Sequence, residues 1–180
     1  MADVSVLVLV GSLRAASVNR QLAELAADSA PEGVSLTIYD GLADMPFYSE
    51  DLDTDDPPAA VAALRAAATA ADAALVVTPE YNGTIPGVLK NAIDWLSRPF
   101  GNGALKGKPL AVIGGAAGRF GGVWAHDETR KSFGIAGPRV VDSITLSVPL
   151  ASLGGKRPRE SAEVAAAVRE AVGRLAAEVG

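Results

Sequence analysis

Cysteine is absent from this chain of 180 residues, and its absence excludes several kinds of chemistry. A chain without thiols has no disulfide framework, no thiolate nucleophile, no zinc–thiolate site and no iron–sulfur cluster held by cysteines. The lack of cysteine also fits a reducing compartment, so we expect a cytoplasmic protein. A single histidine, His126, is too few for a metal site built from several histidines. We therefore expect no resident metal ion.

Basic residues and long apolar runs are also scarce. Sixteen Lys and Arg residues face twenty-one Asp and Glu residues, which gives a net charge of −5. Nucleic-acid binders gain affinity by neutralising phosphates, so this balance argues against that class, although a small anionic ligand needs only a local site. The first apolar run, Val4–Val10, is too short to span a bilayer and follows Asp3 rather than a basic segment. We expect neither nucleic acid nor a membrane as a partner.

What the chain does contain is a regular alternation of short β-branched runs with longer stretches of helical periodicity. Strands are predicted at residues 4–10, 34–38, 74–78, 110–113 and, in broken form, 139–148. Helices are predicted at 17–30, 59–71, 86–96, 123–133 and 157–179, and a loop at 40–58. Five strands alternating with five helices imply parallel βαβ units. We predict an α/β fold in which residues 1–180 form a single domain, a three-layer doubly wound five-stranded parallel sheet.

The loop after the first strand carries groups that suit a phosphate. In a doubly wound sheet, ligands bind outside the carboxyl ends of the strands, where the strand order reverses. Gly11 permits a tight turn there, Ser12 and Ser17 offer hydroxyls, Asn19 an amide and Arg14 a planar cation at a helix N-terminus. The spacing is neither G-x-G-x-x-G nor a P-loop. The alternative is that Ser17 only caps the helix and Arg14 is a solvated loop charge.

Two further loops are candidates for the same site. Residues 78–87, after the third strand, contain two prolines and two glycines, with Tyr81 and Asn82 able to contact a planar heterocycle. Simple turn chemistry explains this loop equally well. Residues 114–122, after the fourth strand, are rich in glycine, so that backbone N–H groups can approach a ligand closely. A flexible connector is the alternative there.

Together the three loops resemble those of the NADPH-dependent FMN reductase family. The resemblance rests on GSLRxxSxNRxLA beginning at Gly11, on PEYNGxIPGxLKNAIDWLSR ending at Arg98, and on GxxGG ending at Gly122. It extends from Val4 to about Val141. The resemblance implies a flavodoxin-like fold, bound FMN, and NADPH or NADH as co-substrate. The family includes chromate, quinone and azo-dye reductases, and commonly forms homodimers or homotetramers.

The resemblance also implies which residues contact the flavin, taken position by position. The FMN phosphate would be bound by Ser12, Arg14, Ser17, Val18 and Asn19. The ribityl chain and isoalloxazine would be bordered by Pro79, Glu80, Tyr81, Asn82 and Gly83. The pyrimidine side of the ring would be bordered by Gly115, Ala116, Ala117 and Gly118. Arg119 and Phe120 would border the substrate, with Arg119 either a partner of the NADPH 2′-phosphate or a solvated loop cation.

Two departures from the family pattern affect these assignments. Many relatives place a serine near Ala116 or Ala117, so here a contact to the flavin carbonyl would come from a backbone N–H. Relatives often carry Arg-Ala-Gln within residues 123–127, where this chain reads Val-Trp-Ala-His-Asp. The contribution of that helix to subunit contacts or acceptor binding is therefore left open.

The expected activity is an oxidoreductase reaction in which the flavin carries the chemistry and no side chain acts as general acid or base. NADPH would deliver hydride to flavin N5 and leave, and a quinone, azo compound, metal oxyanion or free flavin would then use the same face, a ping-pong mechanism. Backbone donors at residues 115–118 would stabilise negative charge on the ring. The first alternative is a flavodoxin-type electron carrier acting with protein partners, although its usual phosphate loop lacks an arginine where Arg14 stands. The second is a flavin-free binding domain.

Other conspicuous residues are given structural interpretations. We expect His126 to serve in packing or at the surface, and Trp95 and Trp124 to lie in the core or at an interface. The acidic run at residues 51–56 lacks the spacing of a calcium loop, so a solvated loop is expected there.

Overall fold

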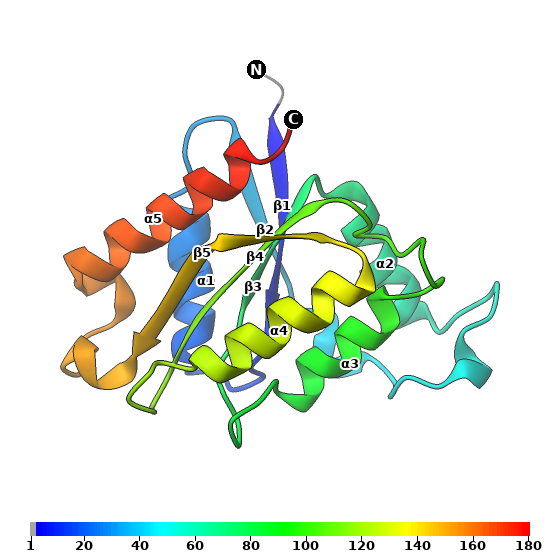
Figure 1. Ribbon diagram of the computed structural model, residues 1–180, viewed down its shortest axis with the longest axis horizontal. Helices are drawn as coiled ribbons and strands as arrows, with labels where there is room; N and C mark the ends of the chain where they lie inside the picture. The colour runs from blue at the N-terminus through cyan, green and yellow to red at the C-terminus, as the bar shows by residue number, and fades with distance from the viewer. Residues whose placement is uncertain (1–2) are drawn as a thin grey trace.

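The computed structural model describes residues 3–180 and contains five strands and five α-helices (Figure 1). The strands are β1 (Val4–Val10), β2 (Val34–Tyr39), β3 (Ala73–Val77), β4 (Pro109–Ala116) and β5 (Arg139–Pro149). The helices are α1 (Val18–Asp28), α2 (Ala59–Ala70), α3 (Gly87–Leu96), α4 (Val123–Ala136) and α5 (Ala162–Ala177). None of these helices is long and apolar enough to cross a lipid bilayer.

All five strands are parallel and lie in the order β2-β1-β3-β4-β5. This is the flavodoxin-like order of the doubly wound fold, so the predicted fold class is confirmed. The order reverses between β1 and β3, which places the topological switch point at the carboxyl ends of these two neighbouring strands. Ligand sites in such sheets lie at that edge.

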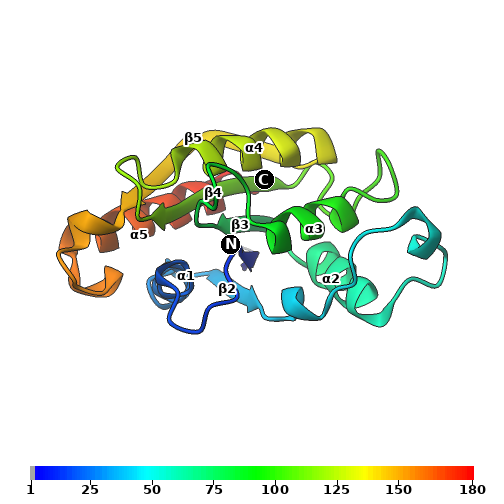
Figure 2. The ribbon, with the colours of Figure 1, turned by 90° about the horizontal axis from the view of Figure 1, so that it is seen from below.

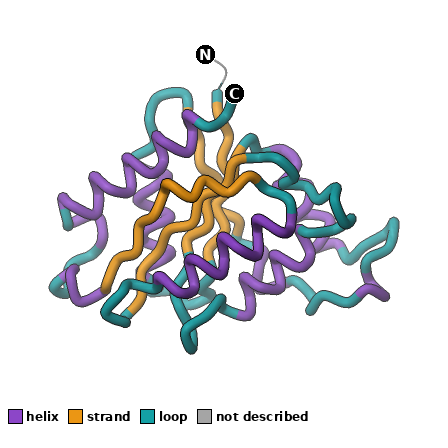
Figure 3. The backbone as a smooth tube through the Cα atoms, viewed as in Figure 1, coloured by secondary structure: helices purple, strands orange, loops and turns teal. Residues whose placement is uncertain are grey.

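Helices cover both faces of the sheet and create two cores (Figures 2 and 3). On one face α1 and α5 pack against the sheet through residues such as Leu22 and Val168. On the other face α2, α3 and α4 do so through residues such as Leu64 and Phe133. Successive strand residues point to opposite faces, so Val8 joins the first core while its neighbour enters the second. A strand covered on both faces has to be apolar throughout, which explains the uninterrupted run of β1.

The predicted helix at 157–179 begins later than expected. Residues Pro158–Glu160 form a 3₁₀ turn, and α5 starts at Ala162 after Ser161, whose hydroxyl accepts the N–H of Val164. The hydroxyl cap supplies a partner for an N–H group that the first helical turn leaves free. The helical periodicity of the sequence does not locate this cap, so the predicted start is wrong by five residues.

The expectation of a solvated acidic loop at residues 51–56 is wrong for Asp53. Its side chain is 11% exposed and accepts hydrogen bonds from Arg65 at 2.7 Å and from Arg98 at 2.8 Å. The hydrogen bond from Arg98, followed by that from Arg65, holds the pKa of the Asp53 carboxyl below its ordinary value. Asp53 therefore ties the long loop between β2 and α2 to α2 and to the end of α3.

The strand predicted as broken, β5, is continuous but bulged where it pairs with β4. Leu110 lies opposite Val140, whereas Val112 lies opposite Thr145, so β5 advances five residues while β4 advances two. Such a bulge leaves backbone groups without partners in the ladder.

Arg130 of α4 supplies partners for this bulge. Its side chain is 8% exposed and donates to the carbonyl of Val112 at 2.9 Å and to that of Ile144 at 3.3 Å. The exposed carboxylate of Asp127 accepts another guanidinium N–H at 2.8 Å. A buried carbonyl left without a donor costs about 1–3 kcal/mol, so Arg130 stabilises the bulged register.

Replacing Arg130 with Met keeps most of the apolar stem and removes both donors. We expect Arg130→Met to lower the free energy of unfolding by about 2–3 kcal/mol, measured by urea denaturation, because two buried carbonyls lose a partner. The matched control is Lys131→Met, since Lys131 is the exposed neighbour on the same helix. Equal stability of the two variants would show that the bulge does not need the guanidinium.

Candidate functional site

The loops that follow β1, β3 and β4 meet around Thr78 at the switch point. A Cβ atom on Gly11 would lie 2.4 Å from the Thr78 hydroxyl oxygen, and one on Gly114 would lie 2.0 Å from the Thr78 carbonyl oxygen. Neither position has room for any side chain. The three loops singled out from the sequence therefore lie in direct contact with one another.

The first loop presents groups that suit an anion, and Ser17 also caps α1. The Ser17 hydroxyl accepts the N–H groups of Asn19 at 3.2 Å and Arg20 at 3.4 Å, so Ser17 caps α1, and within residues 3–180 no acceptor takes its hydroxyl proton. Arg14 is exposed and makes no ion pair with any residue between 3 and 180. The N–H of Val18 has no partner within the same residues. In the part of the chain that the structure describes, the Arg14 guanidinium and the N–H of Val18 are thus without protein partners at the helix N-terminus, beside Ser17, which is 2% exposed.

Asn19 joins the loop after β1 to the end of β4, where the loop after β4 begins. Its amide is 3% exposed, donates to the carbonyl of Gly115 at 2.9 Å and accepts the N–H of Gly115 at 2.8 Å. Both polar ends of the Asn19 side chain, and the N–H of Gly115, are therefore satisfied within the protein. The Asn19 amide and the Gly115 N–H, both predicted to contact the flavin, are thus bonded to each other.

The β3–α3 loop contains a tight turn that presents Tyr81. The N–H groups and carbonyls of Tyr81 and Thr84 are paired in both directions at 3.1 Å. Asn82 (φ 53°) and Gly83 (φ 75°) both lie in the left-handed region, the pattern of a type I′ turn. Turn chemistry thus accounts for the Asn-Gly pair. Tyr81 is 49% exposed, and its hydroxyl lies 3.5 Å from that of Ser12, so the loops after β1 and β3 also meet at the surface.

The start of α4 supports this same loop. The carboxylate of Glu80 accepts the N–H of Ala125 at 3.2 Å and so caps the helix, whose first turn has no acidic residue of its own. The hydroxyl of Thr84 donates to Glu128. Glu80, predicted to border the flavin, thereby directs a carboxylate oxygen to the backbone of α4.

His126 lies fully buried beneath the three loops. Its Nε2 is 2.9 Å from the carbonyl of Thr78 and its Nδ1 is 2.7 Å from the hydroxyl of Ser147. A carbonyl can only accept, so Nε2 carries the proton and Nδ1 accepts from Ser147 in the neutral ring. Burial disfavours the charged ring and holds the pKa of His126 below its ordinary value of 6.5. The expected packing role is confirmed.

Exposed aromatic rings border the β4–α4 loop. The Arg119 guanidinium lies 5.4 Å from the ring centre of Phe120, and that ring is 6.4 Å from the ring of Trp124. Phe120 is 56% exposed and Trp124 59% exposed, so Trp124 does not belong to the core. Trp95, by contrast, is fully buried and donates its indole N–H to the carbonyl of Pro46 at 2.9 Å, as expected of a core residue.

The sequence analysis missed a second group of polar residues at this edge. Arg20 of α1 pairs with Glu24 at 3.1 Å and with Asp40, which directly follows β2. The carboxyl end of β2 meets the same edge of the sheet as that of β1, so the position of Asp40 after a predicted strand was the signal that could have found it.

Comparison with known proteins adds a family and a reaction class. Residues 4–152 match the family described as NADPH-dependent FMN reductase. A quinone reductase of Pseudomonas putida is 42% identical over 151 residues, which cover 84% of this chain and 78% of that protein. A 2-hydroxy-1,4-benzoquinone reductase of a Burkholderia species is 47% identical over 123 residues, 68% of this chain and 66% of that one. The solved structure of FerB, a flavoenzyme NAD(P)H:(acceptor) oxidoreductase from Paracoccus denitrificans, has a TM-score of 0.81 at 30% identity and covers 95% of this chain and 96% of its own.

The buried histidine predicts a specific pH dependence of stability. Because the folded-state pKa of His126 lies below 6.5, the unfolded chain binds a proton first, and this residue destabilises the fold as the pH falls below 6.5. His126→Gln keeps an N–H donor for Thr78 without a titrating ring. We expect the free energy of unfolding of this variant to fall less than that of the wild type between about pH 7.5 and pH 5 in urea titrations.

His126→Leu provides the matched comparison, since it removes the donor as well as the charge. We expect it to be less stable than His126→Gln at every pH by about 1–3 kcal/mol, the cost of an unpartnered buried carbonyl. If the free energies of unfolding of the wild type and His126→Gln depended on pH in the same way, His126 would not be the group that destabilises the fold at low pH.

Proposed function

The chain belongs to the NADPH-dependent FMN reductase family and is an NAD(P)H-dependent FMN or quinone reductase; from this premise we propose that it binds FMN at the three loops around Thr78 and reduces a small-molecule acceptor there by a ping-pong mechanism. The acceptor class we propose is a quinone, an azo compound, a metal oxyanion or free flavin. The observation that carries the proposal is the direct contact of these loops at the switch point, joined by the Asn19–Gly115 hydrogen bonds.

The first loop fits the phosphate of FMN. An arginine fork and a helix N-terminus both favour a phosphate, and here Arg14 and the N–H of Val18 are free of other partners within residues 3–180. Ser12 and Ser17 add hydroxyl protons. Asn19 acts indirectly, because its amide fixes the start of α1 against the end of β4.

The second and third loops fit the ribityl chain and the planar ring. Tyr81 presents a half-exposed ring at a turn whose shape is set by Asn82 and Gly83, with Pro79 and Glu80 fixing its base. Residues 116–118 lie opposite with no bulky side chain, so their backbone N–H groups can approach the pyrimidine edge closely. Donors placed there favour negative charge developing on the ring.

FMN held by these loops would supply the hydride-transfer chemistry. The role of the protein is to bind FMN and the substrates and to orient them. His126 is committed to Thr78 and Ser147, and Glu80 to α4, so neither is a candidate general acid or base. Arg119 and Phe120 border the exposed side, where we propose that co-substrate and acceptor enter in turn. The names of the Pseudomonas putida and Burkholderia relatives support a quinone as acceptor.

A flavodoxin-type electron carrier is the competing function, because it shares the strand order. The presence of Arg14 in the phosphate loop and of Pro79-Glu80-Tyr81 in the second loop favours the reductase. The two functions differ in one observable property, since only a reductase takes hydride directly from a nicotinamide.

We also propose that the protein forms a homodimer or homotetramer. Phe100 is 83% exposed and Ile135 is 75% exposed, and both line a groove of about 260 Å³ between α3 and α4. Large apolar side chains gathered in this way suit a subunit contact. Light scattering after size exclusion is expected to give a multiple of 18.3 kDa, and Ile135→Asp is expected to lower it. A fully active monomer would contradict this proposal.

The function is tested by an anaerobic absorption spectrum of the purified protein with FMN, recorded before and after addition of NADH or NADPH. We expect rapid bleaching at a catalytic concentration of protein, followed by recovery of the colour when a benzoquinone is added, because hydride enters and leaves through the same site. A stable flavin spectrum with both nicotinamides would instead support an electron carrier.

Two variants test where FMN binds, by the affinity of each variant for FMN. Arg14→Ala is expected to weaken FMN binding about tenfold in a fluorescence titration, since a charge-assisted hydrogen bond is lost. Arg169→Ala, an exposed arginine on α5, is the control for the change of charge and is expected to bind FMN like the wild type. Equal affinities of the two variants would remove Arg14 from the phosphate site.

A further inference from the structure

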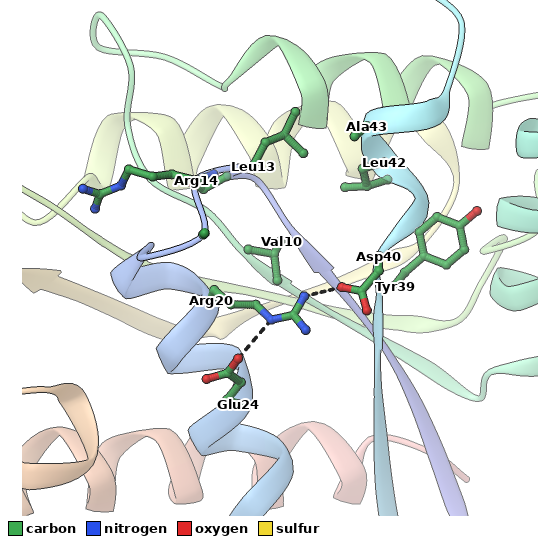
Figure 4. Close-up of a pocket in the computed structure, with 11 residues that line it drawn as sticks. Val10, Leu13, Arg14, Arg20, Glu24, Tyr39, Asp40, Leu42 and Ala43 are labelled. Atoms are coloured by element: carbon green, nitrogen blue, oxygen red, sulfur yellow. Dashed lines mark hydrogen bonds and ion pairs between the residues drawn. The ribbon is translucent and has the colours of Figure 1, made fainter.

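A second recess opens at the carboxyl edge, on the β2 side of the first loop (Figure 4). It has a volume of about 420 Å³, within the usual range of small-molecule sites, about 300–1,000 Å³. Its lining comes from the end of β1, the β1–α1 loop, α1 and the segment after β2. It includes Ser12 and Arg14 but no residue of the loops after β3 and β4. The recess therefore adjoins the proposed FMN surface and shares Ser12 and Arg14 with it.

The recess combines an apolar wall with a charged floor. Leu13 and Leu42 supply apolar surface from two sides, and Figure 4 shows Arg20 between Glu24 and Asp40 below them. Arg20 donates from Nε to Glu24 at 3.1 Å and from a terminal nitrogen to Asp40. Apolar walls with a few fixed polar groups are typical of small-molecule and cofactor sites.

Arg20 holds Asp40 in place as a hydrogen-bond acceptor. The hydrogen bond that Arg20 donates to the Asp40 carboxylate is the main reason why the pKa of Arg20 is raised. Only one oxygen of Asp40 accepts a hydrogen bond within residues 3–180, and the side chain, which lines the recess, is 70% exposed. In dinucleotide-binding folds, an acidic residue beyond the first βα unit of the doubly wound sheet accepts a hydrogen bond from the ribose 2′-hydroxyl of NAD.

The charge of the floor disfavours an additional phosphate. Arg20 contributes one positive charge against the carboxylates of Glu24 and Asp40, and Arg14 extends away from this group in Figure 4. The Asp40 carboxylate would repel a ribose 2′-phosphate placed beside it, whereas a ribose 2′-hydroxyl would donate a hydrogen bond to that carboxylate.

We propose that this recess takes the adenosine end of the nicotinamide co-substrate, and that Asp40 makes the enzyme prefer NADH to NADPH. The proposal rests on the proposed function, because it concerns the co-substrate of that reaction. Asp40 is a specificity-determining residue here, and Arg20 is the residue that positions it. Arg119, the earlier candidate for a 2′-phosphate, lies in the β4–α4 loop and takes no part in this recess.

The first test is the ratio of kcat/KM for NADH to kcat/KM for NADPH, measured with a fixed benzoquinone. We expect the wild type to favour NADH about tenfold or more. Asp40→Asn is expected to lower this ratio about tenfold, because it removes the charged acceptor for the 2′-hydroxyl of NADH and the repulsion of the 2′-phosphate of NADPH. Asp44→Asn is the matched control, since Asp44 is exposed, nearby and outside the recess. A wild type that prefers NADPH, or an Asp40→Asn ratio equal to that of Asp44→Asn, would overturn the proposal.

The second test measures binding without turnover. The FMN-loaded protein is titrated calorimetrically with ADP-ribose and with 2′-phospho-ADP-ribose, and ADP-ribose is expected to bind more tightly in the wild type but not in Asp40→Asn. If FMN is bleached by nicotinamides while Asp40→Asn changes neither ratio nor binding, only this inference fails. If bleaching fails while Asp40 still governs ADP-ribose binding, only the proposed function fails.

Discussion

The carboxyl edge of this sheet depends on how closely the chain can pack around Thr78. Gly11 and Gly114, at the ends of β1 and β4, both pack against Thr78. They can do so only because neither residue carries a side chain. The same carbonyl that excludes a Cβ at position 114 accepts the buried N–H of His126. Close approach of backbone to backbone therefore sets the geometry of the candidate site, and the polar side chains around it secure what the glycines permit.

Helix α4 connects the site to the rest of the sheet. At its start it fixes the β3–α3 loop through Ala125 and His126, and one turn later Arg130 completes the bulge of β5. The contacts of Ala125 and His126 come from residues 123–127, where the sequence analysis expects a departure from the family pattern. The buried position of His126 gives that departure a structural reason, while exposed Trp124 remains free to contact a ligand or a second subunit.

Periodicity and composition predict the fold well because they report which faces are buried. All five strands, all five helices and the switch point follow from runs such as Val4–Val10, which have few alternatives in a parallel sheet. The partners of individual polar groups do not follow. Asn19 and Gly115 are 96 residues apart and His126 and Thr78 are 48 apart, and no local pattern records such pairs. The loops of the candidate site are recognised by their motifs, whereas the partners of Asp40 and Arg130 lie on other elements of the fold.

The ion pairs of Asp53 have a consequence for chain entropy. They fasten the stretch between residues 40 and 58 near one end, and the hydrogen bonds of Asn91 to Pro46 and Tyr48 fasten it near the middle. These contacts divide one long loop into several short loops. Closing each short loop costs less conformational entropy than closing the long one. The turn that borders the recess beside Asp40 can then fluctuate, or change during evolution, independently of the acidic segment beyond it.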